Sequence, residues 1–292
     1  MLGCLAGDVA GSIFEGSSHN PVSGPLFSSN SSYTDDSVMV CAVAEALVSG
    51  EDVASALRRW VISHPARGYG AWFKRWCHTP GAPSYNSYCN GGAVRVAPVA
   101  LVARSEAEAR SMTIDVAAVT HSDPAAMHAS EVLALAIYRL VRGATKEEIR
   151  VFAEASGMWR HETVSQLREL AEFSELATHS VPIAFVCALE ANSTESAIRN
   201  AIAVGGDTDT IAAIAGAIAE PLYGLPDHLR LQVEAFVPCE MLVALAALYE
   251  KSGFSYPLPG SLICSAQQLA GESPSGGWRG RLLGALRRLH CT

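Results

Sequence analysis

Residues 205–220 read GGDTDTIAAIAGAIAE, a segment of glycines and carboxylates that leads directly into an apolar run. The run is about half as long as the roughly 18 residues that suggest a membrane helix, so we expect a helix buried in the protein core. Asp207, Asp209 and Thr210 would then present oxygen atoms from the first turn of that helix. This segment predicts a helical core that carries polar groups at one of its ends.

The rest of the chain continues the helical pattern. Alanine dominates the sequence, and alanine, leucine, glutamate and arginine are all strong helix formers. Thr145 and Glu148 have the spacing of a capping box, with Thr145 at the N-cap. No convincing series of alternating β-branched and aromatic residues indicates strands. The predicted fold class is all-α, with helices expected over residues 37–49, 52–64, 106–119, 125–141, 146–156, 161–175, 195–204, 211–219 and 241–249.

Composition excludes two classes of protein. The chain has 292 residues, of which 49% are hydrophobic and 17% charged, against roughly 25% charged residues in an average globular protein. Intrinsic disorder is excluded because it needs low hydrophobicity and high charge. The net charge of −8 argues against nucleic-acid binding through phosphates, since the cationic excess for that binding is missing.

Three features predict the compartment: the first residues of the sequence, the mean hydropathy and the cysteines. Asp8 interrupts the first residues, which also lack a basic leader, so no signal peptide is indicated. Mean hydropathy is +0.20, yet no apolar run suggests a membrane helix. The eight cysteines contain no C-x-x-C pair and indicate free thiols in a reducing compartment. We therefore expect a cytoplasmic protein without a membrane partner.

The composition changes near residue 252. It is even up to that point, which predicts one domain over residues 1–252. Residues 253–292 are rich in glycine, proline and serine and predict a loop or linker, followed by a short basic helix over 278–290. This helix would either bind a membrane or an acidic partner through its arginines, or dock its leucine stripe on the domain. On so short a stretch we favour docking.

Two further segments interrupt the helical pattern with glycines or carboxylates. Residues 7–15 read GDVAGSIFE, and if they form one helix, Asp8 and Glu15 lie on the same face of it. Residues 33–37 read YTDDS and lie just ahead of an apolar helix, where adjacent aspartates would feel the positive end of the helix dipole.

The aspartates of YTDDS and GGDTDT form two acidic clusters beside buried helices. Such clusters are costly unless a cation neutralises them, and hard divalent cations with oxygen ligands are the natural solution. The four aspartates carry a charge of −4, which two divalent cations would balance. Taken alone, Asp35 or Asp207 is more simply explained as a helix N-cap. The two clusters together with Glu15 favour metal binding.

The motifs GDVAGSIFE, YTDDS, NGGAVRVAP, THSDP and GGDTDTIAAIAGAI, in this order and separation, resemble the ADP-ribosylglycohydrolase family. The resemblance spans roughly residues 3–250, and the pairing of TDDS with GGDTDTIA is its specific part. It implies a compact single-domain orthogonal helical bundle with a dinuclear magnesium or manganese centre in a cleft. It also implies cleavage of the bond that joins ADP-ribose to a protein side chain or a related acceptor.

The resemblance also implies a role for each matching residue. Glu15 matches the catalytic glutamate, and residues 87–92 match the glycine-rich loop that receives the diphosphate. Without the resemblance, that loop would be an ordinary turn and His121 a structural histidine. Cys89 departs from the family pattern, where a small residue such as glycine is more usual. The implied metal ligands are Thr34, Asp35, Asp36, Asp207, Asp209 and Thr210, and the implied substrate-binding residues are Ser87, Tyr88, Asn90, Gly91 and His121.

The function implied is a metal-dependent ADP-ribosyl-acceptor hydrolase whose partners are ADP-ribose and an ADP-ribosylated protein, modified on arginine or serine. Two alternatives remain: a hydrolase of a small ADP-ribose conjugate, and an inactive homologue that only binds ADP-ribose. The inactive homologue is disfavoured because all the metal-ligand positions and Glu15 are present. Contacts to the acceptor are expected from residues 17–32 and 69–76.

Overall fold

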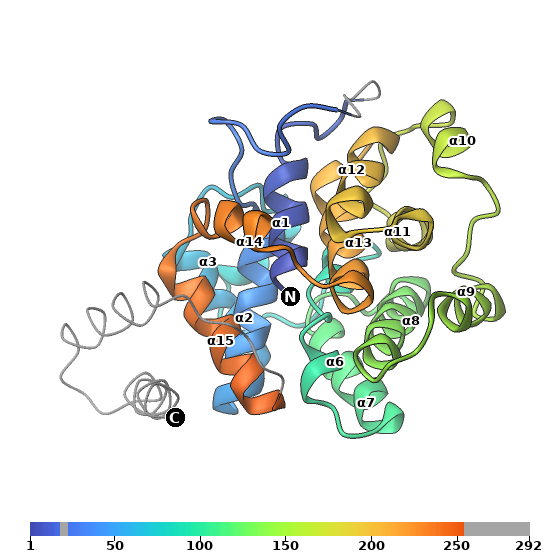
Figure 1. The fold of residues 1–292 in the computed structure, drawn as a ribbon. Helices are drawn as coiled ribbons and strands as arrows, with labels where there is room; N and C mark the ends of the chain where they lie inside the picture. Colours follow the sequence, from blue (N-terminus) through green and yellow to red (C-terminus); the bar gives the residue numbers. More distant parts are fainter. Residues whose placement is uncertain (18–22, 254–292) are drawn as a thin grey trace, which may run out of the picture.

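Helix α1 (Leu2–Gly11) lies at the centre of the computed structural model, which describes residues 1–17 and 23–253 (Figure 1). These residues form fifteen helices and no strand, with one isolated bridge between Cys89 and Leu176, so the predicted all-α class is confirmed. The remaining helices are α2 (Asp35–Ser49), α3 (Val53–Ser63), α4 (Ala71–Cys77), α5 (Gly91–Val94), α6 (Val99–Val102), α7 (Glu106–Ala117), α8 (Pro124–Val141), α9 (Lys146–Ala155), α10 (Val164–Glu169), α11 (Ala177–Glu190), α12 (Thr194–Val204), α13 (Thr208–Tyr223), α14 (Asp227–Glu234) and α15 (Cys239–Ser252).

Helices α1 and α13 pack backbone against backbone. Gly3, Gly7 and Gly11 recur every fourth residue of α1, and so they share one face of that helix. A Cβ atom on Gly7 would lie 2.0 Å from the carbonyl oxygen of Ala212, and one on Gly216 would lie 2.0 Å from that of Gly3. Only glycine permits this approach, which brings the residues after α1 next to the start of α13.

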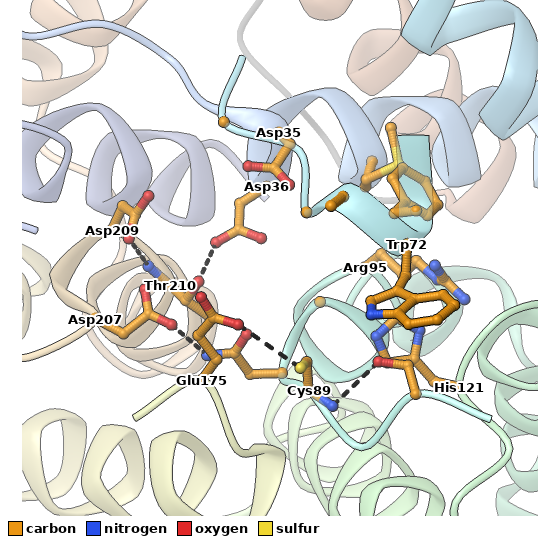
Figure 2. Close-up of a pocket in the computed structure, with 18 of the residues that line it drawn as sticks. Asp35, Asp36, Trp72, Cys89, Arg95, His121, Glu175, Asp207, Asp209 and Thr210 are labelled. Carbon is orange, nitrogen blue, oxygen red and sulfur yellow. Dashed lines mark hydrogen bonds between the residues drawn. The ribbon is translucent and has the colours of Figure 1, made fainter. Parts of the chain in front are cut away.

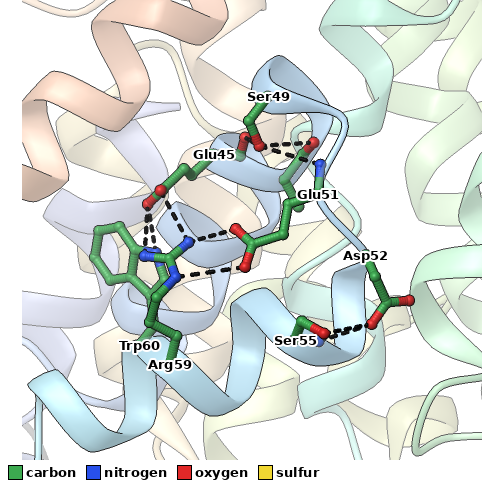
Figure 3. A network of polar contacts seen from close by, with 8 residues as sticks. Glu45, Ser49, Glu51, Asp52, Ser55, Arg59 and Trp60 are labelled. Carbon is green, nitrogen blue, oxygen red and sulfur yellow. Dashed lines mark hydrogen bonds and ion pairs between the residues drawn. The ribbon is translucent and has the colours of Figure 1, made fainter. Parts of the chain in front are cut away.

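A buried carboxylate fixes α2 against α3. Glu45 of α2 is fully buried and accepts a hydrogen bond from Trp60 Nε1 at 2.7 Å (Figure 3). Arg59 Nη2 lies 2.9 Å from Glu45 Oε1 and 2.5 Å from Glu51 Oε2, so one guanidinium joins both carboxylates. Because a buried carboxylate needs such partners, this network holds the axis of α2, whose first turn carries Asp35 and Asp36.

Most predicted helices have bounds within a few residues of the observed ones, and the Thr145–Glu148 capping box of α9 is confirmed. The helix predicted over residues 161–175 is wrong, because α10 begins after a second capping box at Thr163 and ends at Glu169. Leu167 is the one buried residue of α10, so little apolar contact supports a longer helix. The segment that follows leaves the helix, and its Glu175 carbonyl accepts a hydrogen bond from Asn90 N at 2.7 Å.

Three other predictions concern cysteines, membrane contact and the C-terminal segment. Six cysteines of the described residues are free thiols: Cys4, Cys41, Cys77, Cys89, Cys187 and Cys239. Over residues 1–17 and 23–253, no helix has both the length and the apolar character to cross a membrane. The basic helix predicted over 278–290 lies outside the described residues, and the domain boundary at residue 252 stays a prediction.

Candidate active site

A cavity of about 310 Å³ opens where the first turns of α2 and α13 meet the segment that precedes α5. Its two sides differ in chemistry: Figure 2 shows the aspartates on one side, and Trp72, Arg95 and His121 on the other. We call these the acidic wall (Glu15, Asp35, Asp36, Asp207, Asp209 and Thr210) and the loop wall (Ser87, Cys89, Asn90, Gly91, Arg95 and His121).

The first turn of α2 supplies Asp35 and Asp36. Thr34 is the N-cap of this helix, and its hydroxyl accepts a hydrogen bond from Asp36 N at 3.3 Å. The alternative that Asp35 is a simple N-cap is therefore wrong. Asp35 lies one position inside the helix, where its side chain lines the cavity. Thr34 does not line the cavity; its hydroxyl donates to Asp8 Oδ1 at 2.5 Å.

Asp8 supports the acidic wall from outside the cavity. Its carboxylate is fully buried and accepts hydrogen bonds from Thr34 N at 2.9 Å, from Ser37 N at 3.2 Å and from the Ser37 hydroxyl. Burial, reinforced by the charge of Asp209, raises the pKa of Asp8 to about 6. The buried face of α1 thus ties the start of α2 in place, and Asp8 itself does not reach the cavity.

The first turn of α13 supplies the second cluster. Thr210 Oγ1 donates to Asp36 Oδ2 at 2.7 Å, which connects the two acidic motifs directly. Asn90 Nδ2 donates to Asp207 Oδ2 at 2.7 Å, which connects the acidic wall to the loop wall. Asp207 occupies the N-cap position of α13 but makes no side-chain capping bond. Capping therefore does not account for its carboxylate.

Glu15 joins this cluster from a turn, because α1 ends at Gly11. The expectation that Asp8 and Glu15 share a helix face is therefore wrong: the glycine face of α1 stops where α13 begins, and the chain turns away. The turn is held by hydrogen bonds from Gly16 N to Gly206 O, 2.8 Å, and from Gly206 N to Ser17 O, 3.2 Å. One oxygen each from Glu15, Asp207 and Asp209 lie within 4.8 Å of one another.

The acidic wall has the donors and the charge of a divalent-cation site. Burial, followed by the charges of Asp209 and Asp8, raises the pKa of Asp35 to about 8. The pKa values of Asp36 and Asp207 are also raised well above their ordinary range, with burial as the largest cause. No Lys, Arg or His in the described part of the chain forms an ion pair with these carboxylates. Buried, unpaired oxygen donors of this kind fit a hard divalent cation.

The loop wall is built from backbone groups and a neutral histidine. Ser87 N donates to Thr120 O at 3.0 Å, so the 87–92 segment rests on the turn that carries His121. A Cβ on Gly92 would lie 2.6 Å from His121 Cγ, so the imidazole packs directly on the backbone of α5. Burial lowers the pKa of His121 well below its usual range, which keeps the ring uncharged.

Some cavity residues were not predicted. Tyr88 is 60% exposed and does not line the cavity, whereas Tyr85, three residues earlier, does. Trp72 falls in the stretch expected to contact the acceptor; the described part of residues 17–32 contributes nothing to the cavity. Glu175 was hidden in an overlong predicted helix, and Cys89 Sγ lies 3.8 Å from its carboxylate. Arg95 lies inside the motif NGGAVRVAP, but nothing in that motif predicts that its side chain lines the cavity.

Three comparisons with known proteins agree with one another. The sequence model described as ADP-ribosylglycohydrolase matches residues 1–256. ADP-ribosylhydrolase ARH3 of Mus musculus is 27% identical, over 86% of this chain and 91% of that protein. ADP-ribosylarginine hydrolase Tri1 of Pseudomonas putida is 25% identical, over 69% and 62% of the two chains. A solved structure, an ADP-ribosylglycohydrolase-related protein complex, superposes with a TM-score of 0.67 at 23% identity, covering 86% of this chain and 95% of that one.

Proposed function

Because the chain belongs to the ADP-ribosylglycohydrolase family, we propose that it is a metal-dependent hydrolase that removes ADP-ribose from a modified arginine or serine of a protein. The observation that carries this proposal is the cavity itself. Glu15 lies beside buried, unpaired aspartates on one wall, and a glycine-containing segment faces them on the other. The names of the relatives, an ADP-ribosylhydrolase and an ADP-ribosylarginine hydrolase, support the same reaction class.

We assign the metal ligands to Asp35, Asp36, Asp207, Asp209 and Thr210, whose oxygens line the acidic wall. Thr34 stays in the proposed set, since its hydroxyl oxygen keeps one lone pair beyond its bonds to Asp36 N and Asp8. These residues would hold magnesium or manganese, which would supply Lewis acidity and help to orient the vicinal hydroxyls of the ribose.

Glu15 is the proposed catalytic residue. Water forms the new bond to the anomeric carbon of the ribose while the bond to the acceptor breaks, through a transition state with oxocarbenium character. Glu15 takes the proton from this water or gives one to the departing acceptor atom. Burial, Asp209 and Glu175 all raise the pKa of Glu15 above its ordinary value, which favours a carboxyl that can hold a proton as well as accept one.

The loop wall is the proposed binding site for the diphosphate. Backbone N–H groups of a glycine-containing turn bind phosphate oxygens without a large net positive charge, which suits this acidic protein. Ser87, Asn90, Gly91 and neutral His121 all line the cavity. Tyr88 remains in the proposal as an exposed residue between Ser87 and Cys89, two residues that line the cavity.

The test is hydrolysis of two peptides, one ADP-ribosylated on arginine and one on serine, by the purified protein. EDTA should abolish release of ADP-ribose, and magnesium or manganese should restore it. ADP-ribose binding, measured by calorimetry with and without the cation, separates loss of chemistry from loss of binding. Full activity in a thoroughly chelated sample would contradict metal dependence, and no release from either peptide would contradict the acceptor class.

A further inference from the structure

Arg95 is a buried cation on the loop wall. It lies just after α5, is 1% exposed, and still lines the cavity. Among the described residues that line this cavity, Arg95 alone carries a permanent positive charge, because His121 is held neutral. The opposite wall holds only carboxylates and a threonine.

No carboxylate in the described part of the chain compensates this charge. Arg95 Nη2 donates to the carbonyl oxygens of Val116 and Ala117, both at 3.0 Å, and its Nε has no hydrogen-bond partner. No ion pair to Arg95 is formed within residues 1–17 and 23–253. Burial lowers its pKa to about 10, so it stays charged at neutral pH. A buried charge without a counterion is strongly destabilising, so an anionic ligand next to it would be favoured.

The carbonyls that hold Arg95 belong to the last two residues of α7, and the turn that follows them carries His121. The Ala117 carbonyl also accepts His121 N at 2.8 Å, and the Thr120 carbonyl accepts Ser87 N at 3.0 Å. The guanidinium is therefore bound to the end of α7, directly before the turn on which the segment assigned to the diphosphate rests. Figure 2 shows Arg95 beside Trp72 and His121, on the side of the cavity away from Asp207 and Asp209.

We propose that Arg95 is the residue that makes this cavity selective for a diphosphate: its buried guanidinium, which has no ion pair, lines the cavity beside the loop segment and attracts the phosphate charge. This inference rests on the proposed function. The charge acts on the diphosphate equally before and during bond cleavage, because the phosphates do not react. Removing it therefore raises KM and the Kd of ADP-ribose, while kcat changes little.

The experiment compares Arg95→Met, Arg95→Lys and a control, Arg142→Met, in the full chain. Arg142 also donates to backbone carbonyls, those of Ala100 at 3.1 Å, Tyr138 at 3.2 Å and Ala103 at 2.5 Å, but it does not line the cavity. For Arg95→Met we expect KM and the ADP-ribose Kd to rise about tenfold, with kcat within about threefold of wild type. Lysine keeps the charge without the planar fork, so Arg95→Lys should stay within about threefold in KM.

Arg142→Met should lower Tm and leave both KM and Kd unchanged. A wild-type KM in Arg95→Met overturns the inference, as does an Arg95→Lys variant as weak as Arg95→Met, since the carbonyl contacts and not the charge would then matter. Should Arg95→Met fail to fold, Arg95→Lys decides alone: a lowered Tm with a near-normal KM supports the role of the charge, and a tenfold rise contradicts it. Wild-type protein that neither binds ADP-ribose nor hydrolyses the peptides overturns the proposed function and this inference together.

Discussion

The acidic wall buries negative charge, and the loop wall buries a positive charge. Neither wall contains a residue of the opposite charge that would neutralise it. The acidic wall collects aspartates from the first turns of two helices, while the loop wall combines one guanidinium with the backbone amides of a turn. The proposed ligand has the matching division: a ribose whose hydroxyls bind metals, and an anionic diphosphate. The walls therefore differ in what they need from outside, a cation on one side and an anion on the other.

One carboxylate of the acidic wall acts on all the others. Burial is the largest cause of the raised pKa values of Asp8, Asp35, Asp36, Asp207 and Glu15, and the charge of Asp209 is a further cause in all five. Its carboxylate is buried, and its Oδ1 also accepts a hydrogen bond from Thr210 N at 3.0 Å. An asparagine at this position would keep that bond and remove the repulsion.

The largest effect is expected for Asp209→Asn. Turnover should fall to background, because a proposed metal ligand is lost. The chelated protein should nevertheless become more stable, by about 3 °C in Tm, since the like charges lose their common neighbour. Asp115→Asn, on the exposed face of α7, is the matched control and should change neither quantity. A fall in Tm for chelated Asp209→Asn would contradict the view that this carboxylate destabilises the metal-free protein.

Glu15→Gln should reduce turnover by at least about a hundredfold, the usual scale for a general acid or base. Calorimetry should show ADP-ribose binding close to that of wild type, because the other carboxylates remain. Glu175→Gln changes the second exposed carboxylate of the cavity and should reduce turnover far less than Glu15→Gln does. Wild-type turnover in Glu15→Gln would remove Glu15 from the mechanism.

On the loop wall, Gly92→Ala should raise KM about tenfold, because the new Cβ would lie 2.6 Å from His121 Cγ and force the ring to move. Gly91→Ala is the neighbouring control in α5: its Cβ would meet His121 Nε2 at 3.8 Å, an ordinary contact. Steady-state kinetics of both variants isolate the displacement of the histidine. An equal rise in KM for the two substitutions would show that a change in the backbone of α5, and not displacement of the ring, weakens substrate binding.

A smaller effect is expected from pH on the chelated protein. The pKa of Asp8 is about 6 and that of Asp35 about 8 in the folded protein, above the ordinary 3.8, so folding takes up protons. Their contribution to stability is full below about pH 4 and is lost as the pH rises toward 8. Tm in EDTA should therefore fall from pH 5 to pH 8, and magnesium should flatten this slope. A chelated Tm that rises over this range would contradict the raised pKa values.

The smallest effect is expected when the chain is truncated after Lys251. All residues assigned to either wall lie upstream of that position, so turnover should stay within about twofold of wild type. Circular dichroism and a peptide assay on the same sample provide the measurement. Folded but inactive protein would place the C-terminal segment at the cavity.

The acidic wall was largely predictable from the sequence, and the loop wall only in part. TDDS and GGDTDT are contiguous motifs at helix starts, where sequence position fixes which side chains lie together. Glu175 and Arg95 reach the cavity through tertiary contacts, Glu175 after a helix that ends early and Arg95 through carbonyls at the end of α7. Helical periodicity carries no information about such contacts. It also could not show that α1 stops at Gly11, because that end is set by packing on α13.

The glycine face of α1 also determines when the site can form. Thr208 Oγ1 donates to the carbonyl oxygen of Gly11, 197 residues earlier in the chain, and Thr210 bonds to Asp36 across 174 residues. During synthesis the first acidic motif therefore cannot contact the second until nearly three quarters of the chain has been made. Closing so long a loop is a slow, late step in folding. Any chain released before residue 207 would lack Asp207 and Asp209 and the second wall of carboxylates that encloses the site. Metal uptake should therefore report the last stage of folding rather than the first.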